Sequence, residues 1–306
     1  MSNPELRVIS LGWGLQSWTL AAMVALGELG PVDYAIHSDT TWERSTTYEF
    51  SQTWAAWLRE RGVKVITVTS EVTRGMVTNE WGGTFIPAFT LRPAHTVISD
   101  GWYFGEDEEG ESIEIFDPDM VGQEIRIEES RGQLRRQCTE RWKIRPIKRF
   151  ISQELKRRGL AKTPGVVEQW LGITFDEWHR ANDSGVKYIK HRHPLLEMDY
   201  TRADCLAWLE RHGLPNPGKS ACVFCPYHSI SFWEMMKREG GTDWETAVMV
   251  DKRIRDERPP YPLYVHPERK PLTQAVTIPE DFGATQLSFL ASNDQDSECD
   301  SGFCFL

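Results

Sequence analysis

The sequence predicts an α/β fold built on a doubly wound parallel sheet, and three observations point to it. Over the first 70 residues, short apolar segments alternate with longer amphipathic ones at the spacing of a strand–helix–strand–helix–strand unit. Polar or Gly-rich residues directly follow the first two apolar segments, as they do where ligands bind at the carboxyl ends of parallel strands. The length of 306 residues suits one large α/β domain with additions, or two domains.

Each element of this unit carries its own signal. The apolar run Leu6–Ser10 predicts the first strand, and the helical pattern of Ser17–Leu29 predicts the helix after it. Val32–Ser38 predicts a second strand. The amphipathic segment Thr46–Arg61 predicts the second helix, and Val63–Val68, rich in β-branched residues, predicts the third strand. A right-handed parallel βαβαβ unit follows from this order.

The rest of the chain predicts an insertion and a helical second half. Residues 96–130 are acidic and hairpin-like, and we interpret them as an insertion. Further elements are expected as an amphipathic helix, a strand and a helix capped by Thr201, at Ile147–Arg158, Val167–Gly172 and Thr201–His212. We therefore expect a nucleotide-binding core over 1–197 and a cysteine-bearing helical region over 198–306, whose last 25 or so residues form a mobile tail.

Composition limits the classes of function. The net charge is −10 and the charged fraction is 26%, which is ordinary for a globular protein and unfavourable for broad binding to nucleic acid. No apolar run reaches the roughly 18 residues that a membrane span needs, and the N-terminus lacks a signal-peptide pattern. We expect a cytoplasmic protein without membrane contact. In that compartment its cysteines favour metal, cluster or redox chemistry over disulfides: Cys138, Cys205, Cys222, Cys225, Cys299 and Cys304.

A Gly-rich turn between the first strand and its helix predicts an anion-binding loop. Glycines let backbone N–H groups approach a phosphate, and the following helix contributes the positive end of its dipole. The hydroxyls of Ser10 and Ser17 can donate to phosphate oxygens. The loop is neither a Walker A motif nor a dinucleotide fingerprint. Its expected ligand-binding residues are Ser10, Gly12, Trp13, Gly14, Gln16 and Ser17.

The end of the second strand is also polar, from Ser38 to Glu43. Because carboxyl ends of parallel strands share one edge of a sheet, we expect Asp39 and Thr40 to lie beside the first loop, where Asp39 can hold ribose, Mg²⁺ or a ligand amine.

Three of the cysteines form a pattern typical of a metal or cluster site. Cys138 lies in the most basic part of the chain, near Arg136, Lys143 and Arg145, and Cys222 and Cys225 form a CxxC motif followed by proline. Three thiolates can bind an iron–sulfur cluster with one open position. With Cys205 or His228 as a fourth ligand they can instead bind zinc. The basic residues predict anion binding next to Cys138.

Taken in order, these motifs resemble the adenine nucleotide alpha-hydrolase-like (PP-loop) superfamily. Residues 12–17 resemble its pyrophosphate loop, with Gln16 where the family has Asp, and 39–48 resemble a segment of the PAPS reductase-like branch. Segments 138–149 and 201–226 resemble those of cluster-containing adenylyl-sulfate reductases, with Thr139 in place of one cysteine. The resemblance implies a sheet of the PP-loop ATPase type, a 4Fe-4S cluster on Cys138, Cys222 and Cys225, and an adenine nucleotide as ligand.

The resemblance also implies roles for single residues. Asp39 is the candidate to take over the Mg²⁺-associated role of the missing loop Asp, and Lys143 is expected to stabilise phosphate charge. Glu298-Cys299 resembles the tail motif of sulfonucleotide reductases, which makes Cys299 a candidate nucleophile or persulfide carrier with Cys304 as resolving partner. Arg136 and Arg145 are expected to bind the nucleotide.

Three functions remain open from the sequence. The first is an ATP-dependent sulfur transferase, which adenylates a nucleic acid or a small metabolite and inserts sulfur from a donor. The second is a sulfonucleotide reductase that uses Cys299 and a thioredoxin-like reductant. The third is a nucleotide-binding accessory subunit of a nucleic-acid modification system. We rank them in this order because the tail motif is incomplete.

Overall fold

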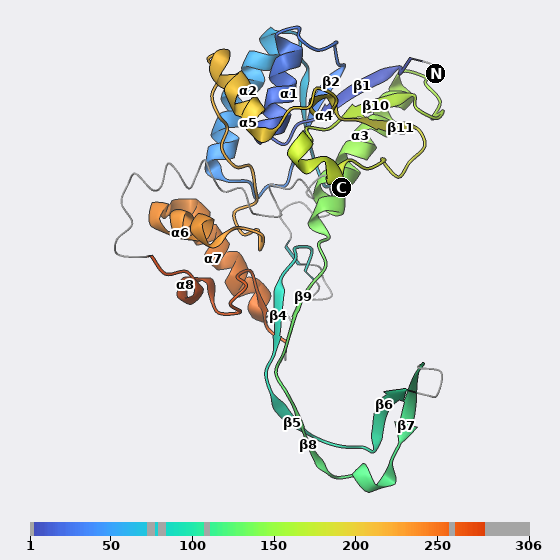
Figure 1. Ribbon diagram of the computed structural model, residues 1–306, viewed down its shortest axis with the longest axis vertical. Coiled ribbons are helices and arrows are strands. Elements are labelled where there is room, and N and C mark those ends of the chain that lie inside the picture. The colour runs from blue at the N-terminus through green and yellow to red at the C-terminus, as the bar shows by residue number, and fades with distance from the viewer. Residues whose placement is uncertain (1–2, 72–76, 79–83, 107–110, 257–260, 279–306) are drawn as a thin grey trace.

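The computed structural model describes residues 3–71, 77–78, 84–106, 111–256 and 261–278, and its centre is a five-stranded parallel sheet. The strand order is β11-β10-β1-β2-β3 (Figure 1). The strands are β1 (Leu6–Ser10), β2 (Tyr34–Asp39), β3 (Val65–Thr69), β10 (Val167–Trp170) and β11 (Ile189–Arg192). The expected doubly wound α/β fold is confirmed.

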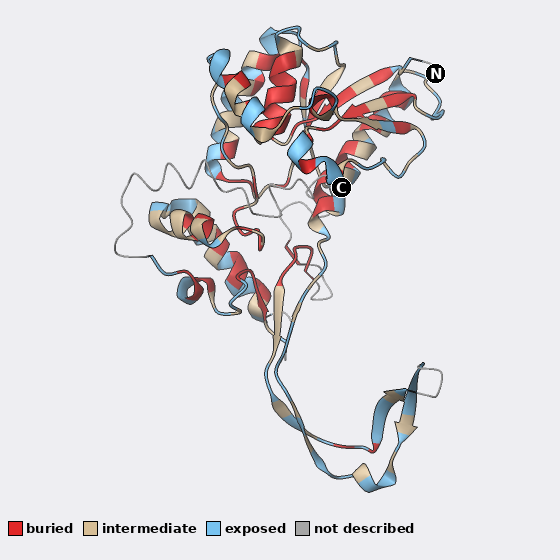
Figure 2. Ribbon diagram, viewed as in Figure 1, coloured by how far each residue is buried: buried red, intermediate tan, exposed pale blue. Residues whose placement is uncertain are grey.

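Helices cover both faces of the sheet because successive residues of each buried strand point to opposite sides. On one face, Ile9 of β1 packs with α1 (Leu15–Ala25), α2 (Ser45–Glu60) and α5 (Arg202–Arg211). On the other face, Leu6 and Val8 pack with α3 (Arg145–Arg157). Figure 2 shows these buried layers in red. The capping box predicted at Thr201 and Asp204 is present at the start of α5.

Strand β1 has β2 on one side and β10 on the other. The chain therefore adds strands first on one side of β1 and later on the opposite side. In doubly wound sheets this reversal leaves a crevice at the carboxyl ends of the strands, where ligands bind. The predicted phosphate loop leaves β1 at this point. The sequence therefore places its Gly-rich turn at the switch point of the sheet.

A second apolar cluster lies below the carboxyl edge of the sheet. Helices α6 (Ile230–Glu239), α7 (Gly241–Asp256) and α8 (Leu272–Ala275) bury Trp233, Val250 and Leu272 against Trp142 and Phe224. By contrast α5, which lies beyond the predicted boundary at residue 198, packs on α1 of the core. The remaining short elements are η1 (Pro118–Met120), η2 (Thr139–Ile144), η3 (Phe175–Arg180), α4 (Pro194–Glu197) and β12 (Leu263–Tyr264).

The predicted insertion is an antiparallel arm that leaves the body of the molecule (Figure 1). Its base is the pair β4 (Phe89–Arg92) and β9 (Ser130–Gln133), with β12 alongside β4. Its middle is β5 (His95–Ile98) with β8 (Glu124–Ile127), and its tip is β6 (Trp102–Glu106) with β7 (Ser112–Phe116). Figure 2 shows that most of the arm is exposed.

The predicted elements and the observed ones differ mainly at their ends. Helix α1 begins at Leu15, two residues before the predicted start, because Gly14 already serves as its N-cap. It ends at Ala25, well before Leu29, and Gly27 follows with φ +80°. None of the helices in the described part of the chain combines the length and the apolar character that crossing a bilayer requires.

Glu154 ties the end of α3 to β2, and we expect it to make the fold acid-sensitive. It accepts hydrogen bonds from Arg157, Arg158 and the Tyr34 hydroxyl, and these partners, Arg157 first, lower its pKa to about 2. A folded pKa below the unfolded one contributes stability above pH 4.5 that is lost as the pH falls toward 2. Since Arg157 is exposed, we expect Glu154→Gln to cost only about 1 kcal/mol at pH 7.

Denaturant unfolding at pH 7 and at pH 3 measures this contribution. The cost of Glu154→Gln is expected to shrink at pH 3, because the carboxyl of the unfolded chain is then mostly protonated and must lose its proton on folding. An equal cost at both pH values would contradict the role of the charged carboxylate.

Candidate active site at the carboxyl edge of the sheet

The loop after β1 holds a tryptophan in a left-handed backbone conformation. Trp13 has φ +61°, a conformation that bulky residues rarely adopt. Its ring is buried and contacts the rings of Trp18, His37 and Phe50 at centroid distances of 6.2–6.3 Å. The packing of this ring opposes the local strain and fixes the loop.

Hydrogen bonds within the loop use some of the groups that the sequence assigned to the ligand. The Ser17 hydroxyl accepts from the Gly12 amide and donates to the Gly14 carbonyl, and the Gln16 side chain donates to Glu177. The amides of Gly14 and Leu15 make none of the hydrogen bonds found among the described residues. They lie at the N-terminus of α1, where an anion is favoured. The loop thus offers backbone N–H groups more than side chains.

Gly172, just after β10, touches the phosphate loop from its other side. A Cβ at this position would lie 2.8 Å from the Ser17 nitrogen and 2.9 Å from the Gln16 carbonyl carbon. Only glycine allows this close approach of two backbones. Gly172 was not among the predicted site residues. From the sequence, a glycine at the end of a strand looks the same whether or not it contacts another loop.

The segment after β2 holds Asp39 by two hydrogen bonds. One oxygen of the Asp39 carboxylate accepts from the Thr41 amide and the Tyr48 hydroxyl, at 2.7 and 2.8 Å. Burial, with this carboxylate next in effect, raises the pKa of Tyr48, so the hydroxyl keeps its proton as a donor. Asp39 is therefore oriented, with its second oxygen unused by these two bonds.

The CxxC segment is paired with this same loop. The amide of Arg44 donates to Ala221 and that of Val223 to Trp42, so the two segments form a short antiparallel bridge. The Ser220 hydroxyl donates to the Gly12 carbonyl and to the Glu43 carboxylate. Residues about 180–210 apart in sequence thus connect the phosphate loop, the β2 loop and the cysteines.

Cys138 reaches the same place through a π-helical turn, η2, which continues into α3. Pro146 lacks the N–H that would bond the carbonyl four residues back, which is that of Trp142. This carbonyl instead accepts the Ser38 hydroxyl at 2.6 Å, at the end of β2. The π-turn therefore anchors the segment after Cys138 to the carboxyl edge of the sheet. Single π-turns often occur at functional sites.

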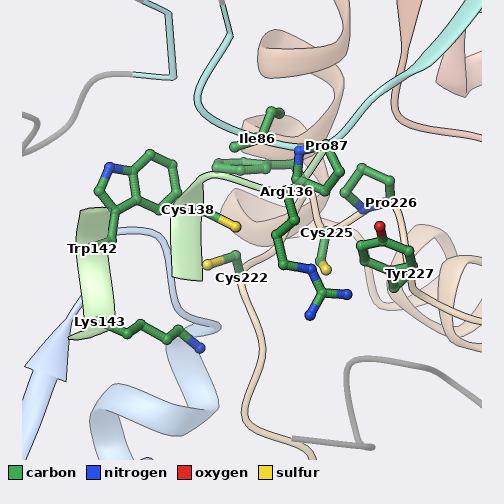
Figure 3. Close-up of a pocket in the computed structure, with 11 residues that line it drawn as sticks. Ile86, Pro87, Arg136, Cys138, Trp142, Lys143, Cys222, Cys225, Pro226 and Tyr227 are labelled. Atoms are coloured by element: carbon green, nitrogen blue, oxygen red, sulfur yellow. The ribbon is translucent and has the colours of Figure 1, made fainter. Parts of the chain in front are cut away.

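Three cysteines line one cavity beneath this edge (Figure 3). The sulfurs of Cys138 and Cys222 point toward each other, and Cys225 lies on the same side beside Arg136. The cavity holds about 400 Å³ of space, part of it open to solvent, and its surface is mostly apolar. The lining includes Ile86, Pro87, Trp142, Phe224, Pro226 and Tyr227.

Charged groups surround this cavity. Arg136 lies over the ring of Tyr227 at 4.2 Å, and Lys143, largely buried, also lines the wall. Glu43 is buried, and accepts from Ser220 and from Thr40, whose hydroxyl also lies 3.3 Å from the Cys222 sulfur. Glu43 was not assigned to the site from sequence, although its motif was recognised. Burial lowers the pKa of His37 and raises that of the Cys222 thiol.

Two of the predicted residues lie away from the cysteine cavity. Cys205 is fully buried among Trp18, Trp208 and Leu209 in the core cluster, and burial raises its pKa to about 12. It faces the core because it belongs to the apolar side of α5. Arg145 is exposed, paired with Glu140 at 3.0 Å, and lines a different pocket. Cys299 and Cys304 lie outside the described residues.

The three thiols share a cavity but do not converge on a point. In the described ranges, no group of three or more His, Cys, Asp or Glu side chains is arranged, as it stands, to hold a metal ion. A zinc ion needs all its ligands within about 2.0–2.3 Å of one centre. The thiolates of an iron–sulfur cluster bind different irons and need no such common point.

A polar crevice opens at the switch point, on the α3 face of the sheet. It contains about 670 Å³ of space, part of it open to solvent, and is lined by Ser10, Lys148 and Gln169, with Ile144 and Ile147 as apolar walls. The Gln169 amide donates to Ser10 at 2.7 Å, and its buried oxygen has no partner among the described residues. A buried amide oxygen of this kind offers an acceptor to a ligand.

Comparison with known proteins adds little to this geometry. No family model matches the sequence, and no curated protein matches it. Among solved structures, the phosphate complex of phosphoadenylyl-sulfate (PAPS) reductase from Candida auris aligns over 71% of this chain and 76% of that chain. The sequences are 14% identical and the TM-score is 0.35. This likeness is too distant to transfer residues or ligands, so the site rests on the contacts described above.

Proposed function

We propose that this chain is an adenine-nucleotide-dependent sulfur transferase of the PP-loop type. The observation that carries the proposal is the meeting of two sites. Cys138, Cys222 and Cys225 line one cavity, and the CxxC segment is hydrogen-bonded to the phosphate loop through Ser220 and Gly12. Nucleotide chemistry and sulfur chemistry would then share one edge of the sheet.

Nucleotide binding draws support from two features of that edge. The amides at the start of α1 suit a phosphate group, and the crevice beside Ser10 and Gln169 suits a base, whose N–H groups can donate to the Gln169 oxygen. Asp39 keeps one carboxylate oxygen for Mg²⁺ or ribose. We assign the phosphates to the loop and the base to the crevice.

A metal centre fits the donor set. Thiolates favour iron–sulfur clusters or zinc over Mg²⁺ or Ca²⁺, and an apolar lining protects a cluster from solvent. Cys138, Cys222 and Cys225 would hold it, leaving one position without a protein ligand. A cluster suits three thiols spread around a cavity better than zinc does. When bound, such a cluster would supply an open iron for sulfur.

The protein's own groups would prepare the substrate. An oxygen of the acceptor attacks the α-phosphorus of ATP, and pyrophosphate leaves. The acceptor oxygen is then attached to AMP and can depart with it when sulfur attacks. Lys143 and Arg136 line the cavity and carry positive charge that would stabilise the phosphate oxygens. His37, neutral at pH 7 because burial lowers its pKa, adds no charge of its own.

Anaerobic purification and two activity assays test the proposal. We expect iron and sulfide with absorbance near about 400 nm, and pyrophosphate released from ATP when an acceptor is present. Zinc in place of iron would contradict the assignment of an iron–sulfur cluster to the three cysteines. Sulfite formed from a sulfonucleotide and thioredoxin, without pyrophosphate from ATP, would overturn the transferase in favour of a reductase. Neither product, together with complex formation in cells, would overturn the transferase in favour of an accessory subunit.

A further inference from the structure

The tip of the arm exposes an aromatic surface. Trp102 and Phe104 lie two residues apart in β6 and therefore point to the same face of the strand. Trp102 is paired with Phe116 of β7, so the three rings share one face of the hairpin. They are 57%, 74% and 48% exposed. An isolated two-stranded hairpin is marginally stable in water, and an exposed aromatic face of this kind marks an interaction site.

The arm also carries the negative charge of the chain. From Phe89 to Gln133 the arm contains 12 Asp and Glu and three Arg, a net charge of −9. Since the whole chain has −10, the rest of the molecule is close to neutral, at −1. Such an arm repels nucleic acid and anionic membranes, and it attracts a basic surface.

A basic pocket with matching chemistry lies on the body of the same chain. Arg141 of η2 and Arg145 and Arg149 of α3, spaced four residues apart, line a pocket at the carboxyl end of β3. It contains about 660 Å³ of space, part of it open to solvent. The ion pairs Arg145–Glu140 and Arg149–Glu71 are exposed on both sides, so they contribute little and can be exchanged. Guanidinium groups bind carboxylates and also stack on aromatic rings.

Within one chain the arm tip cannot use this pocket. Helix α3 lies in the upper body and the β6–β7 hairpin lies at the far end of the arm, which bends away from it (Figure 1). The ion pairs found for residues 124–131 are local, Arg126 with Glu128 and Arg131 with Glu129. A surface and its complement on one chain, too far apart to meet, can meet between two copies.

We propose that the arm docks in the basic pocket of a second copy of this chain. The acidic side chains of the arm face the three arginines, and Trp102 and Phe104 cover the pocket. The contact joins two different surfaces, arm and pocket. This inference does not rest on the proposed function, and its test measures assembly alone.

Sedimentation velocity of the full chain tests the proposal. At low salt, between about 1 and 100 µM, we expect a dimer or larger assembly. It should dissociate in about 1 M salt, where charges are screened beyond about 3 Å. Phe104→Ser in the arm and Arg145→Glu in the pocket should each weaken association at least about tenfold, as for a residue at the centre of an interface. Phe175→Ser, an exposed aromatic outside the arm, is the matched control.

Mixing the two variants gives the sharper result. The Phe104→Ser chain keeps its pocket and the Arg145→Glu chain keeps its arm, so the mixture should associate more tightly than either variant does alone. Misfolding of either variant would prevent this recovery, and circular dichroism checks both. A chain that stays monomeric at about 100 µM, an assembly indifferent to both substitutions, or a mixture that fails to recover would each overturn the proposal.

Discussion

Under the proposed function, replacing Gly172 with alanine is expected to weaken nucleotide binding at least about tenfold. It should also destabilise the protein by about 1–3 kcal/mol, as overpacking does. The added methyl group would lie 2.8–3.0 Å from backbone atoms of Gln16 and Ser17. Backbone cannot rotate away as a side chain does, so the phosphate loop must move. Its amides at the start of α1 would then lose their alignment on the phosphate.

Gly30→Ala is the matched control, because a Cβ at Gly30 meets nothing within 4 Å. Both variants are compared with the parent by titration with ATP and by thermal unfolding. Equal ATP affinity for Gly172→Ala and the parent would show that the loop does not bind the nucleotide, and would contradict the assignment of the phosphates.

The second large effect is expected for Cys138→Ser. Under the proposed function it removes one of three thiolates from the cavity, so bound iron and the absorbance near about 400 nm should fall at least about tenfold. Losing a residue that only hydrogen-bonds a metal ligand already weakens metal binding by about tenfold or more. The serine hydroxyl keeps the size of the side chain but is a poor ligand for iron. Folding should change little, since Cys138 lies at the cavity wall.

Cys205→Ala separates metal binding from the general loss of a thiol. Cys205 lies in the core, away from the cavity, so this variant should keep its full iron content and lose about 1 kcal/mol of stability. Iron lost equally from both variants would contradict the three-cysteine centre. Iron retained by Cys138→Ser would do so as well.

Much of the fold follows from local patterns in the sequence. Four of the five strands and the main helices of the core were predicted, and their order predicts a parallel sheet with helices on both faces. The edge strand β11 (Ile189–Arg192) was not predicted. The ends of elements were less predictable. Gly14 begins α1 two residues early, because capping depends on backbone geometry that several residue types can provide.

The arm shows a further limit of local patterns. Its acidic hairpins were expected over 96–130, yet the pairing of β4 with β9 extends the arm to Phe89 and Gln133. Periodicity in a strand of four residues is too short to identify pairing between segments 40 residues apart. Only the complete ladder defines where the arm begins.

What the sequence alone determined was the class of fold and the position of chemical groups along the chain: a Gly-rich turn after β1, polar residues after β2, and thiols at 138, 222 and 225. Tertiary structure decided which of them meet. It placed those three cysteines around one cavity, kept Cys205 in the core, and set Gly172 against the phosphate loop. The physical reason is that the type of a residue fixes the chemistry of its side chain. The distance between that side chain and residues far along the chain depends instead on how strands and helices pack.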